Sequence, residues 1–247
     1  MELETKLDLL GDGAQFDVTA PGVSFSEALK RREEALRHAS GAIFLAQASG
    51  GGCLPVFKVL LSNECRNDCF YCACRSSAGC ARQTFQPEEL AHTFLRMEER
   101  GLVQGLFLSS GVRDNPERTQ EQMIDTVEIL RRRHHYRGYI HLKILPGVSE
   151  AAIEAAASLA DRVSVNLEAP RVAELARIAP DKHFRDELLR PLQYAAHLHE
   201  AGKVRSGLTT QFVVGGADDC DREYLTAAVW LYGKLSLRRV YYSAFRP

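Results

Sequence analysis

Residues 62–72 read Ser-Asn-Glu-Cys-Arg-Asn-Asp-Cys-Phe-Tyr-Cys and hold three of the seven cysteines of this 247-residue chain. Cys65, Cys69 and Cys72 have the spacing C-x3-C-x2-C, with an aromatic residue directly before the last cysteine. Thiolates are the soft ligands that iron–sulfur clusters need. Three cysteines leave one iron of a [4Fe–4S] cluster without a protein ligand, and an open metal position is typical of a reactive centre. The motif therefore predicts a reactive [4Fe–4S] cluster rather than a passive electron carrier.

Clustered cysteines also occur in disulfides, in zinc sites and as small core residues. The sequence shows no signal peptide and no apolar run near 18 residues, so we expect a cytoplasmic protein without membrane association, in which disulfides are rare. No second C-x2-C knuckle is present, but Cys74 and Cys80 lie near enough to keep a zinc site open as the alternative. Four cysteines outside the motif are expected to be free thiols: Cys53, Cys74, Cys80 and Cys220.

The composition, with 45% apolar and 26% charged residues, is that of a globular protein with enough apolar content for a sizeable core. The formal net charge of −1 gives no support for tight binding of nucleic acid, which needs a basic surface. One basic run, at residues 131–133, is either a local binding patch or a solvated helix end with cations near the C-terminal dipole. We favour the helix end.

Apolar runs and amphipathic stretches alternate along most of the chain. The runs predict strands near 56–62, 105–110, 138–145, 162–168, 207–214 and 238–245. The amphipathic stretches predict helices near 87–100, 117–134, 149–160, 185–201 and 221–234. This alternation indicates an α/β protein with a parallel sheet, closed or nearly closed as a TIM-like barrel with its active site at the C-terminal ends of the strands.

The first fifty or so residues stand outside the alternating pattern. Residues 2–10 and 25–39 are predicted to be helical, and residues 40–52 are rich in Gly, Ala and Ser and predict a linker or loop. We therefore divide the chain into an N-terminal helical extension and linker at 1–53 and a barrel domain at 54–247. Because the chain stops directly after the sixth predicted strand, we expect a form truncated at its C-terminus.

Strand parity predicts a polar cavity, because alternate residues of a strand face opposite sides of the sheet. Buried polar side chains are costly unless they bind something, so a polar inner face favours a ligand-filled cavity. The alternative is that these residues lie exposed at sheet edges. In chain order, the polar faces of four strands carry Lys58 and Ser62, then His141 and Lys143, then Ser164, Asn166 and Glu168, and finally Thr209 and Gln211.

The cysteine motif resembles that of the radical S-adenosylmethionine (radical SAM) superfamily. Further stretches resemble one subfamily, the radical SAM proteins assigned to DNA modification or repair and linked to a partner of the uracil-DNA-glycosylase type. They are Gly-Leu-Phe-Leu-Ser-Ser-Gly-Val at 105–112, Gly-Tyr-Ile-His-Leu-Lys-Ile at 138–144, Asp-Arg-Val-Ser-Val-Asn-Leu-Glu at 161–168 and Ala-Pro-Asp-Lys at 179–182. The resemblance covers most of the chain from about Leu54 onward. It implies a partial (β/α)6 TIM-like barrel, here with an N-terminal helical extension.

The resemblance also implies the cofactors and their chemistry. A [4Fe–4S] cluster on the three cysteines would bind SAM through its open iron, and an electron from the reduced cluster would cleave the S–C5′ bond. The resulting 5′-deoxyadenosyl radical would abstract hydrogen from the substrate. An electron donor such as flavodoxin or ferredoxin is the implied partner.

The SAM contacts that the resemblance implies lie at the ends of the predicted strands. Residues 109–111 stand where the superfamily has a glycine-rich element for the SAM amino group, although serines replace the leading glycines. Residues 164–168 would contact ribose and methionine groups, Lys143 would pair with the carboxylate, and Tyr71 and Gly215 would border the adenine. The full expected set is Tyr71, Ser109, Ser110, Gly111, Lys143, Ser164, Asn166, Glu168, Gln211 and Gly215.

Three arginines are candidates for contacts with an anionic substrate such as a phosphodiester, namely Arg75, Arg82 and Arg113. Their alternative is ordinary solvated surface charge. The function expected from the resemblance is a radical SAM enzyme that modifies or repairs nucleic acid. Two alternatives stay open, a radical SAM enzyme acting on a peptide or small metabolite and a non-enzymatic, metal-stabilised binding module.

Overall fold

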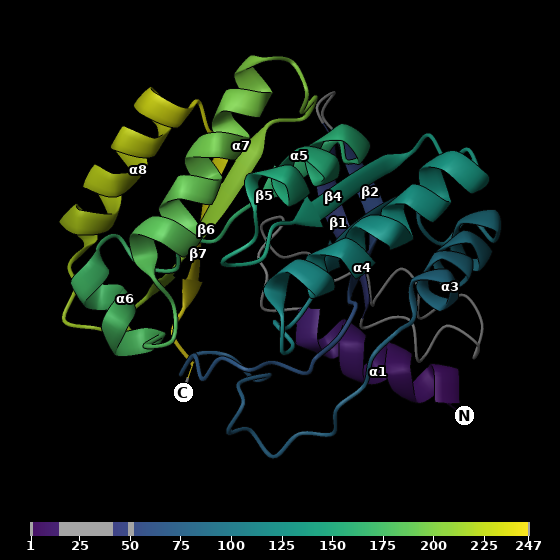
Figure 1. Ribbon diagram of the computed structural model, residues 1–247, viewed down its shortest axis with the longest axis horizontal. Helices are drawn as coiled ribbons and strands as arrows, with labels where there is room; N and C mark the ends of the chain where they lie inside the picture. Colours follow the sequence, from purple (N-terminus) through teal and green to yellow (C-terminus); the bar gives the residue numbers. More distant parts are fainter. Residues whose placement is uncertain (1, 15–41, 49–51, 247) are drawn as a thin grey trace.

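The computed structural model describes residues 2–14, 42–48 and 52–246 and forms one sheet flanked by helices (Figure 1). The helix expected at 25–39 lies outside the described residues. The strands are β1 Ile43–Ala48, β2 Gly52–Leu60, β3 Gly105–Ser109, β4 Tyr139–Lys143, β5 Arg162–Ser164, β6 Leu208–Val214 and β7 Arg239–Ala244. The helices are α1 Glu2–Ala14, α3 Pro87–Glu99, α4 Pro116–Glu128, α5 Glu150–Leu159, α6 Val172–Ile178, α7 Arg190–Glu200 and α8 Asp221–Leu235, with π-helical turns η3 Ile129–Arg133 and η4 Phe184–Leu189.

The seven-stranded sheet runs in chain order from β1 to β7. β1 and β2 pair antiparallel, whereas each neighbouring pair from β2 to β7 is parallel. Within the described residues β1 and β7 form the two edges of the sheet, so it curls into a half-barrel without closing. The six strands from β2 to β7 confirm the predicted mixed α/β class and the partial (β/α)6 TIM-like barrel.

The expectation of a linker at 40–52 is wrong for much of that segment. Its residues include β1, which pairs with β2 from Ile43 opposite Phe57 to Ala48 opposite Gly52. This short apolar stretch was not recognised because Gly, Ala and Ser residues surround it in the sequence. It forms a strand because each of its residues pairs with a residue of β2. The division of the chain after residue 53 remains a prediction, although β1 pairs across it. α6 was also not predicted.

The helices that connect the parallel strands lie side by side over one face of the sheet (Figure 1). α3, α4, α5, α7 and α8 follow the order of the strands they connect, as right-handed crossovers require. α4 begins where the side chain of Asn115 accepts hydrogen bonds from two backbone amides, with Pro116 in its first turn. No helix in the described part of the chain is long and apolar enough to cross a membrane.

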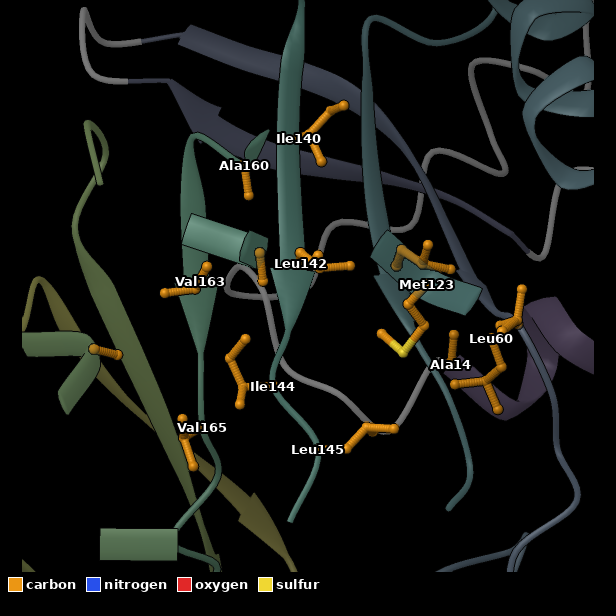
Figure 2. Packing of buried hydrophobic residues seen from close by; sticks show 14 of the residues in the cluster. Ala14, Leu60, Met123, Ile140, Leu142, Ile144, Leu145, Ala160, Val163 and Val165 are labelled. Atoms are coloured by element: carbon orange, nitrogen blue, oxygen red, sulfur yellow. The ribbon is translucent and has the colours of Figure 1, made fainter. Parts of the chain in front are cut away.

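The face of the sheet beneath these helices is apolar. Figure 2 shows Ile140, Leu142 and Ile144 in a row along β4 and its continuation, beside Val163 of β5 and Val165 just after it. Each of these five side chains is at most 1% exposed. Removing their apolar surface from water is the main favourable contribution to the stability of this layer. The predicted apolar parity of both strands is confirmed.

The opposite, concave face of the sheet carries buried polar side chains. Lys58, His141, Ser164, Thr209 and Gln211 are each 5% exposed or less. His141 Nε2 lies 2.8 Å from Ser164 Oγ, a hydrogen bond that joins neighbouring strands. The polar inner face predicted from parity is therefore confirmed, and the alternative of exposed sheet edges is wrong for these residues.

The basic run after α4 divides into one half-buried and two exposed arginines. Arg131 forms an ion pair with Asp161 at 2.7 Å and donates to the backbone carbonyls of residues 136, 138 and 159. Asp161 Oδ2 also accepts from the backbone amide of Ile140. Arg132 and Arg133 have side chains 69% and 68% exposed. The interpretation as a solvated helix end is correct for these two arginines and wrong for Arg131, which ties η3 to the starts of β4 and β5.

The Arg131 network leads to a stability prediction. Arg131→Ala should lower the free energy of unfolding by about 2–4 kcal/mol, because a carboxylate and three carbonyls lose their partner in a partly buried site. Arg132→Ala is the matched control and should change it by less than about 0.5 kcal/mol. Urea denaturation followed by circular dichroism measures both. Equal losses for the two variants would show that the network adds nothing to stability.

Candidate functional site

A cavity of about 380 Å³ lies at the C-terminal edge of the parallel strands. Its lining includes the last residues of three consecutive strands, Leu60, Ser109 and Lys143. This volume and this position are typical of a site for a small molecule in an α/β fold. The expected site residues that line the cavity are Cys65, Cys69, Tyr71, Cys72, Ser109, Ser110, Gly111, Lys143, Asn166, Glu168 and Gln211.

Two of the expected SAM contacts lie elsewhere. Ser164 is buried beneath the cavity, where its hydroxyl group bonds to His141. Gly215 follows β6 with φ of +85°, and no atom lies within 4 Å of the position that a Cβ would take. Gly215 therefore provides a left-handed turn, while Val213 supplies the wall of the cavity at this strand.

The loop that carries the three cysteines is held from both sides by backbone hydrogen bonds. The amide of Arg66 donates to the carbonyl of Val112 at 2.7 Å, in the loop after β3. The amide of Phe70 donates to the carbonyl of Ile178 at 2.9 Å, at the end of α6. The cysteines thus have positions fixed by two separate elements of the barrel.

A third constraint on this loop comes from Gly111. A Cβ at that position would lie 2.3 Å from the carbonyl oxygen of Glu64 and 3.2 Å from Cβ of Cys65. Any side chain there would push the end of β3 away from the cysteine loop. Ser110 is compatible with this approach, since its hydroxyl group donates to the carbonyl of Ser62 at 3.4 Å. Within this element a close approach thus requires glycine at position 111, while serines fit at 109 and 110.

Arg82 organises the same loop from within. Its guanidinium donates to four backbone carbonyls, those of residues 63, 74, 75 and 78. Because these bonds use both of its terminal nitrogens, we assign Arg82 a structural role in place of the expected contact with a substrate. Arg75 also reaches a loop carbonyl, that of Cys72, at 3.3 Å. Arg113 forms an ion pair with Glu64 at 3.1 Å.

The thiols of the motif sit in a protected environment. Cys69 is 5% exposed, and burial raises the pKa of its thiol to about 11. A hydrogen bond with Cys74, together with burial, raises the pKa of Cys72 as well. Binding of a metal to these residues must therefore displace protons, because the thiolate is the ligand. Cys74, Cys80 and Cys220 form no disulfide within the described residues, while the side chain of Cys53 lies outside the described part.

The strand predicted at 162–168 ends early, at Ser164. The amide of Leu167 donates to the hydroxyl group of Thr210 instead of to a backbone carbonyl. Glu168 then takes a left-handed conformation with φ of +64°, which is uncommon for a residue other than glycine. The departure from regular strand geometry brings Asn166 and Glu168 to the wall of the cavity.

Glu168 has a partner that the sequence did not reveal. Its Oε1 lies 3.1 Å from Nζ of Lys182, and the same ammonium group lies 3.0 Å from the hydroxyl oxygen of Tyr71. The side chains of Lys182 and Glu168 are only 9% and 6% exposed. Glu168 Oε2 is buried and accepts no hydrogen bond from any described residue. One carboxylate oxygen is thus paired, and the other is left for a ligand in the cavity.

The charges of this group follow from its surroundings. Burial alone would lower the pKa of Lys182, but the nearby Cys69 thiol and Glu168 carboxylate raise it well above its usual value. Burial also raises the pKa of Tyr71. Lys182 therefore stays an ammonium ion and Tyr71 a neutral phenol at neutral pH. Sequence reasoning gave Lys182 no role, although it lies in the stretch 179–182 that carries the resemblance, because lysine is normally exposed and only the tertiary structure brings Lys182 to Glu168.

These donors fit a [4Fe–4S] cluster and SAM. The three thiols of the motif and that of Cys74 border one cavity, and Gly111 leaves no side chain between the cysteine loop and the end of β3. The buried Glu168 Oε2 needs a hydrogen-bond donor, and the ribose hydroxyl groups of SAM are such donors. Cys65, Cys69 and Cys72 would hold the cluster, and the adjoining wall formed by residues 109–111, 166, 168 and 211 would hold SAM.

Comparison with solved structures shows similarity to several larger proteins. The [FeFe]-hydrogenase maturase HydG from Carboxydothermus hydrogenoformans aligns with 76% of this chain and 44% of its own, at 18% identity and a TM-score of 0.61. Methylornithine synthase PylB aligns with 76% of this chain and 52% of its own, at 14% identity and a TM-score of 0.61. The radical SAM methyltransferase TsrM from Kitasatospora setae aligns with 81% of this chain and 46% of its own, at 12% identity and a TM-score of 0.56.

At these identities the similarity establishes the fold alone. The chain spans about half the length of these proteins. No curated protein matches the sequence. The family model described as the Radical SAM superfamily matches residues 59–235, from the end of β2 to the end of α8. Because this match covers most of the sequence, the chain belongs to the radical SAM superfamily, whose members bind a [4Fe–4S] cluster and S-adenosylmethionine.

Proposed function

We propose that this protein is a radical SAM enzyme whose cluster lies on Cys65, Cys69 and Cys72 and whose SAM site is the adjoining cavity. The observation that carries the proposal is that the three thiols of the motif, beside that of Cys74, border the same cavity as a buried carboxylate oxygen that accepts no hydrogen bond from a described residue. When bound, the reduced cluster supplies the electron that cleaves the S–C5′ bond of SAM, and the resulting radical abstracts hydrogen from the substrate.

The residues around the cavity bind and orient SAM and exclude water. Glu168 accepts from a ribose hydroxyl group, and Asn166 can both donate and accept beside it. Lys143, half-buried at the end of β4, provides a cation for the methionine carboxylate. Leu145 and Val213, each 2% exposed, give the cavity an apolar wall that keeps water from the reacting atoms.

For the substrate we propose a nucleic acid or nucleotide, the class that the resemblance implies. Arg246 lines the cavity, while Arg75 and Arg113 lie on the loops after β2 and β3, at the same edge of the barrel. These are the cations that could contact phosphate groups there. With a net charge of −1, the chain should bind nucleic acid weakly. A peptide or small metabolite is the alternative substrate.

We also propose a small electron-transfer protein, such as a flavodoxin or ferredoxin, as the source of electrons, and the cytoplasm as the location of the reaction. Cleavage of SAM needs an electron that no residue of the cavity supplies, and this requirement supports an external donor. A partner of the uracil-DNA-glycosylase type is proposed on the resemblance alone.

The first prediction tests the cluster. After anaerobic reconstitution the protein should bind about four irons with sulfide, show thiolate-to-iron charge-transfer absorption and convert SAM to 5′-deoxyadenosine with dithionite. Cys65→Ala, Cys69→Ala or Cys72→Ala should remove the cluster and the product. Cys80→Ala is the matched control, because Cys80 is an exposed thiol of the same loop and should leave both unchanged. A stoichiometric zinc ion with no iron would contradict the proposal.

The second prediction tests the SAM site. Asn166→Ala should weaken SAM binding by about 1–3 kcal/mol, because it removes a polar partner inside a cavity. Thr209→Val is the control, since Thr209 is also a buried polar residue of the concave face but does not line the cavity. Calorimetry on reconstituted protein gives both affinities. Unchanged SAM binding by the Asn166 variant would remove this residue from the site.

The third prediction tests the substrate class. Single-stranded DNA should bind weakly, and more weakly still as salt is raised, because phosphate contacts release counterions. Arg75→Glu should reduce this binding. Arg132→Glu should not, because η3 runs toward the start of β4, at the opposite end of the barrel from the cavity. Fluorescence anisotropy at low and moderate salt measures both. No binding at low salt would favour a peptide or small-molecule substrate.

A further inference from the structure

One segment, the turn between α6 and η4, forms hydrogen bonds with the cysteine loop at two points. Asp181 Oδ2 accepts a hydrogen bond from the backbone amide of Asp68 at 2.6 Å, directly before Cys69. Lys182, the next residue, donates to the hydroxyl group of Tyr71, directly before Cys72. The ammonium group lies 5.6 Å from the centroid of the Tyr71 ring, beyond its hydroxyl group, so it contacts this side chain through the hydroxyl oxygen.

The same ammonium group reaches across to the end of β5. Its 3.1 Å bond to Glu168 Oε1 joins the cysteine loop to the only charged side chain that β5 and its continuation to residue 168 contribute to the cavity. Glu168 is held at its backbone as well, because its amide donates to the carbonyl of Gln211 and its carbonyl accepts from the amide of Val213. With its backbone and one carboxylate oxygen fixed, Glu168 has a single direction in which its second oxygen can point.

We propose that Lys182 is a positioning residue that holds the Tyr71 ring and the Glu168 carboxylate in one fixed arrangement, which presents Glu168 Oε2 to the adenosine half of SAM. This inference rests on the proposed function and adds a residue to it. An aromatic ring offers a surface on which a purine stacks, and a carboxylate oxygen accepts from a ribose hydroxyl group. Lys182 therefore acts on SAM binding through these two side chains.

A direct contact between Lys182 and the methionine carboxylate of SAM is the competing assignment. An ammonium group has three donors, and Lys182 directs two of them at Glu168 and Tyr71. Its side chain is 9% exposed, whereas Lys143 is half-buried at the end of β4 and lines the same cavity. These observations favour Lys143 for the carboxylate and Lys182 for holding the adenosine side of the site.

The two assignments differ in which half of SAM loses affinity. Calorimetric titration of the reconstituted holoenzyme with 5′-deoxyadenosine and, separately, with methionine measures each half without turnover. Lys182→Met should weaken the binding of 5′-deoxyadenosine by about tenfold, which is the effect of one lost buried hydrogen-bond partner. It should change the affinity for methionine by less than about twofold. Lys203→Met is the matched control, because Lys203 also pairs with a glutamate, Glu154, but on the surface.

A double-mutant cycle shows whether Lys182 acts through Glu168. If it does, adding Lys182→Met to Glu168→Gln should cost little further affinity for 5′-deoxyadenosine, because both changes disable the same contact. Additive losses in the cycle, or a loss of methionine affinity in Lys182→Met, would overturn the inference. Should Lys182→Met fail to fold, Tyr71→Phe removes only the hydroxyl partner. This variant should weaken the binding of 5′-deoxyadenosine by about threefold and leave the affinity for methionine unchanged.

Iron content separates this inference from the proposed function. Lys182→Met and Tyr71→Phe should keep the full cluster, because neither changes a cysteine. A wild-type protein that takes up no cluster, or that binds no SAM once reconstituted, would contradict the proposed function itself. A wild-type protein that binds both, with a Lys182 variant whose affinity for 5′-deoxyadenosine is normal, would contradict only the role of Lys182.

Discussion

The parallel pairing of β2 to β7 is the constraint on which the rest of the molecule depends. Its register sets Lys58 beside Phe107 and Phe107 beside His141, and two residues further along β4 it sets Lys143 beside Ser164. Because paired residues point to the same face, the crossover helices cover one face of the parallel strands and the polar residues lie on the other face. The same pairing brings the ends of the strands to one edge, where the cavity forms.

On that edge the structure uses short-range contacts to join segments that are far apart in the sequence. Gly111 allows the end of β3 to meet the cysteine loop, and Lys182 joins the loop to Glu168. Each contact depends on a feature that is costly alone, either a close backbone approach or a buried charge. Buried charges persist when they are paired, and Lys182 and Glu168 meet that condition except at one carboxylate oxygen. Unmet hydrogen-bonding capacity inside a protein commonly marks where a ligand binds.

Most of the fold could be read from the sequence, since the six parallel strands and the two faces of β4 follow from apolar periodicity. β1 was not predicted because Gly, Ala and Ser surround it in the sequence, and a strand of this kind is specified by its partner. The end of β5 was predicted wrongly because the alternation of apolar and polar residues continues to Glu168, although regular strand pairing stops after Ser164. Side-chain roles were harder to predict, since Arg82 was expected to contact a substrate, Arg131 to end a helix in solvent, and Lys182 was given no role. Their partners are backbone carbonyls, Asp161 and Glu168, which only the tertiary fold brings near.

The four carbonyls that converge on Arg82 have a consequence for assembly. The hydrogen bonds come from one guanidinium and need no iron, so the protein chain alone determines the shape of the cysteine loop. The conformational entropy of that loop is then lost when the barrel folds and not when the metal arrives. In the described part of the chain no group of three or more possible ligands stands ready to hold a metal, so the cysteine side chains must still rearrange when a cluster binds. A residue that touches no iron would in this way govern how readily the protein matures.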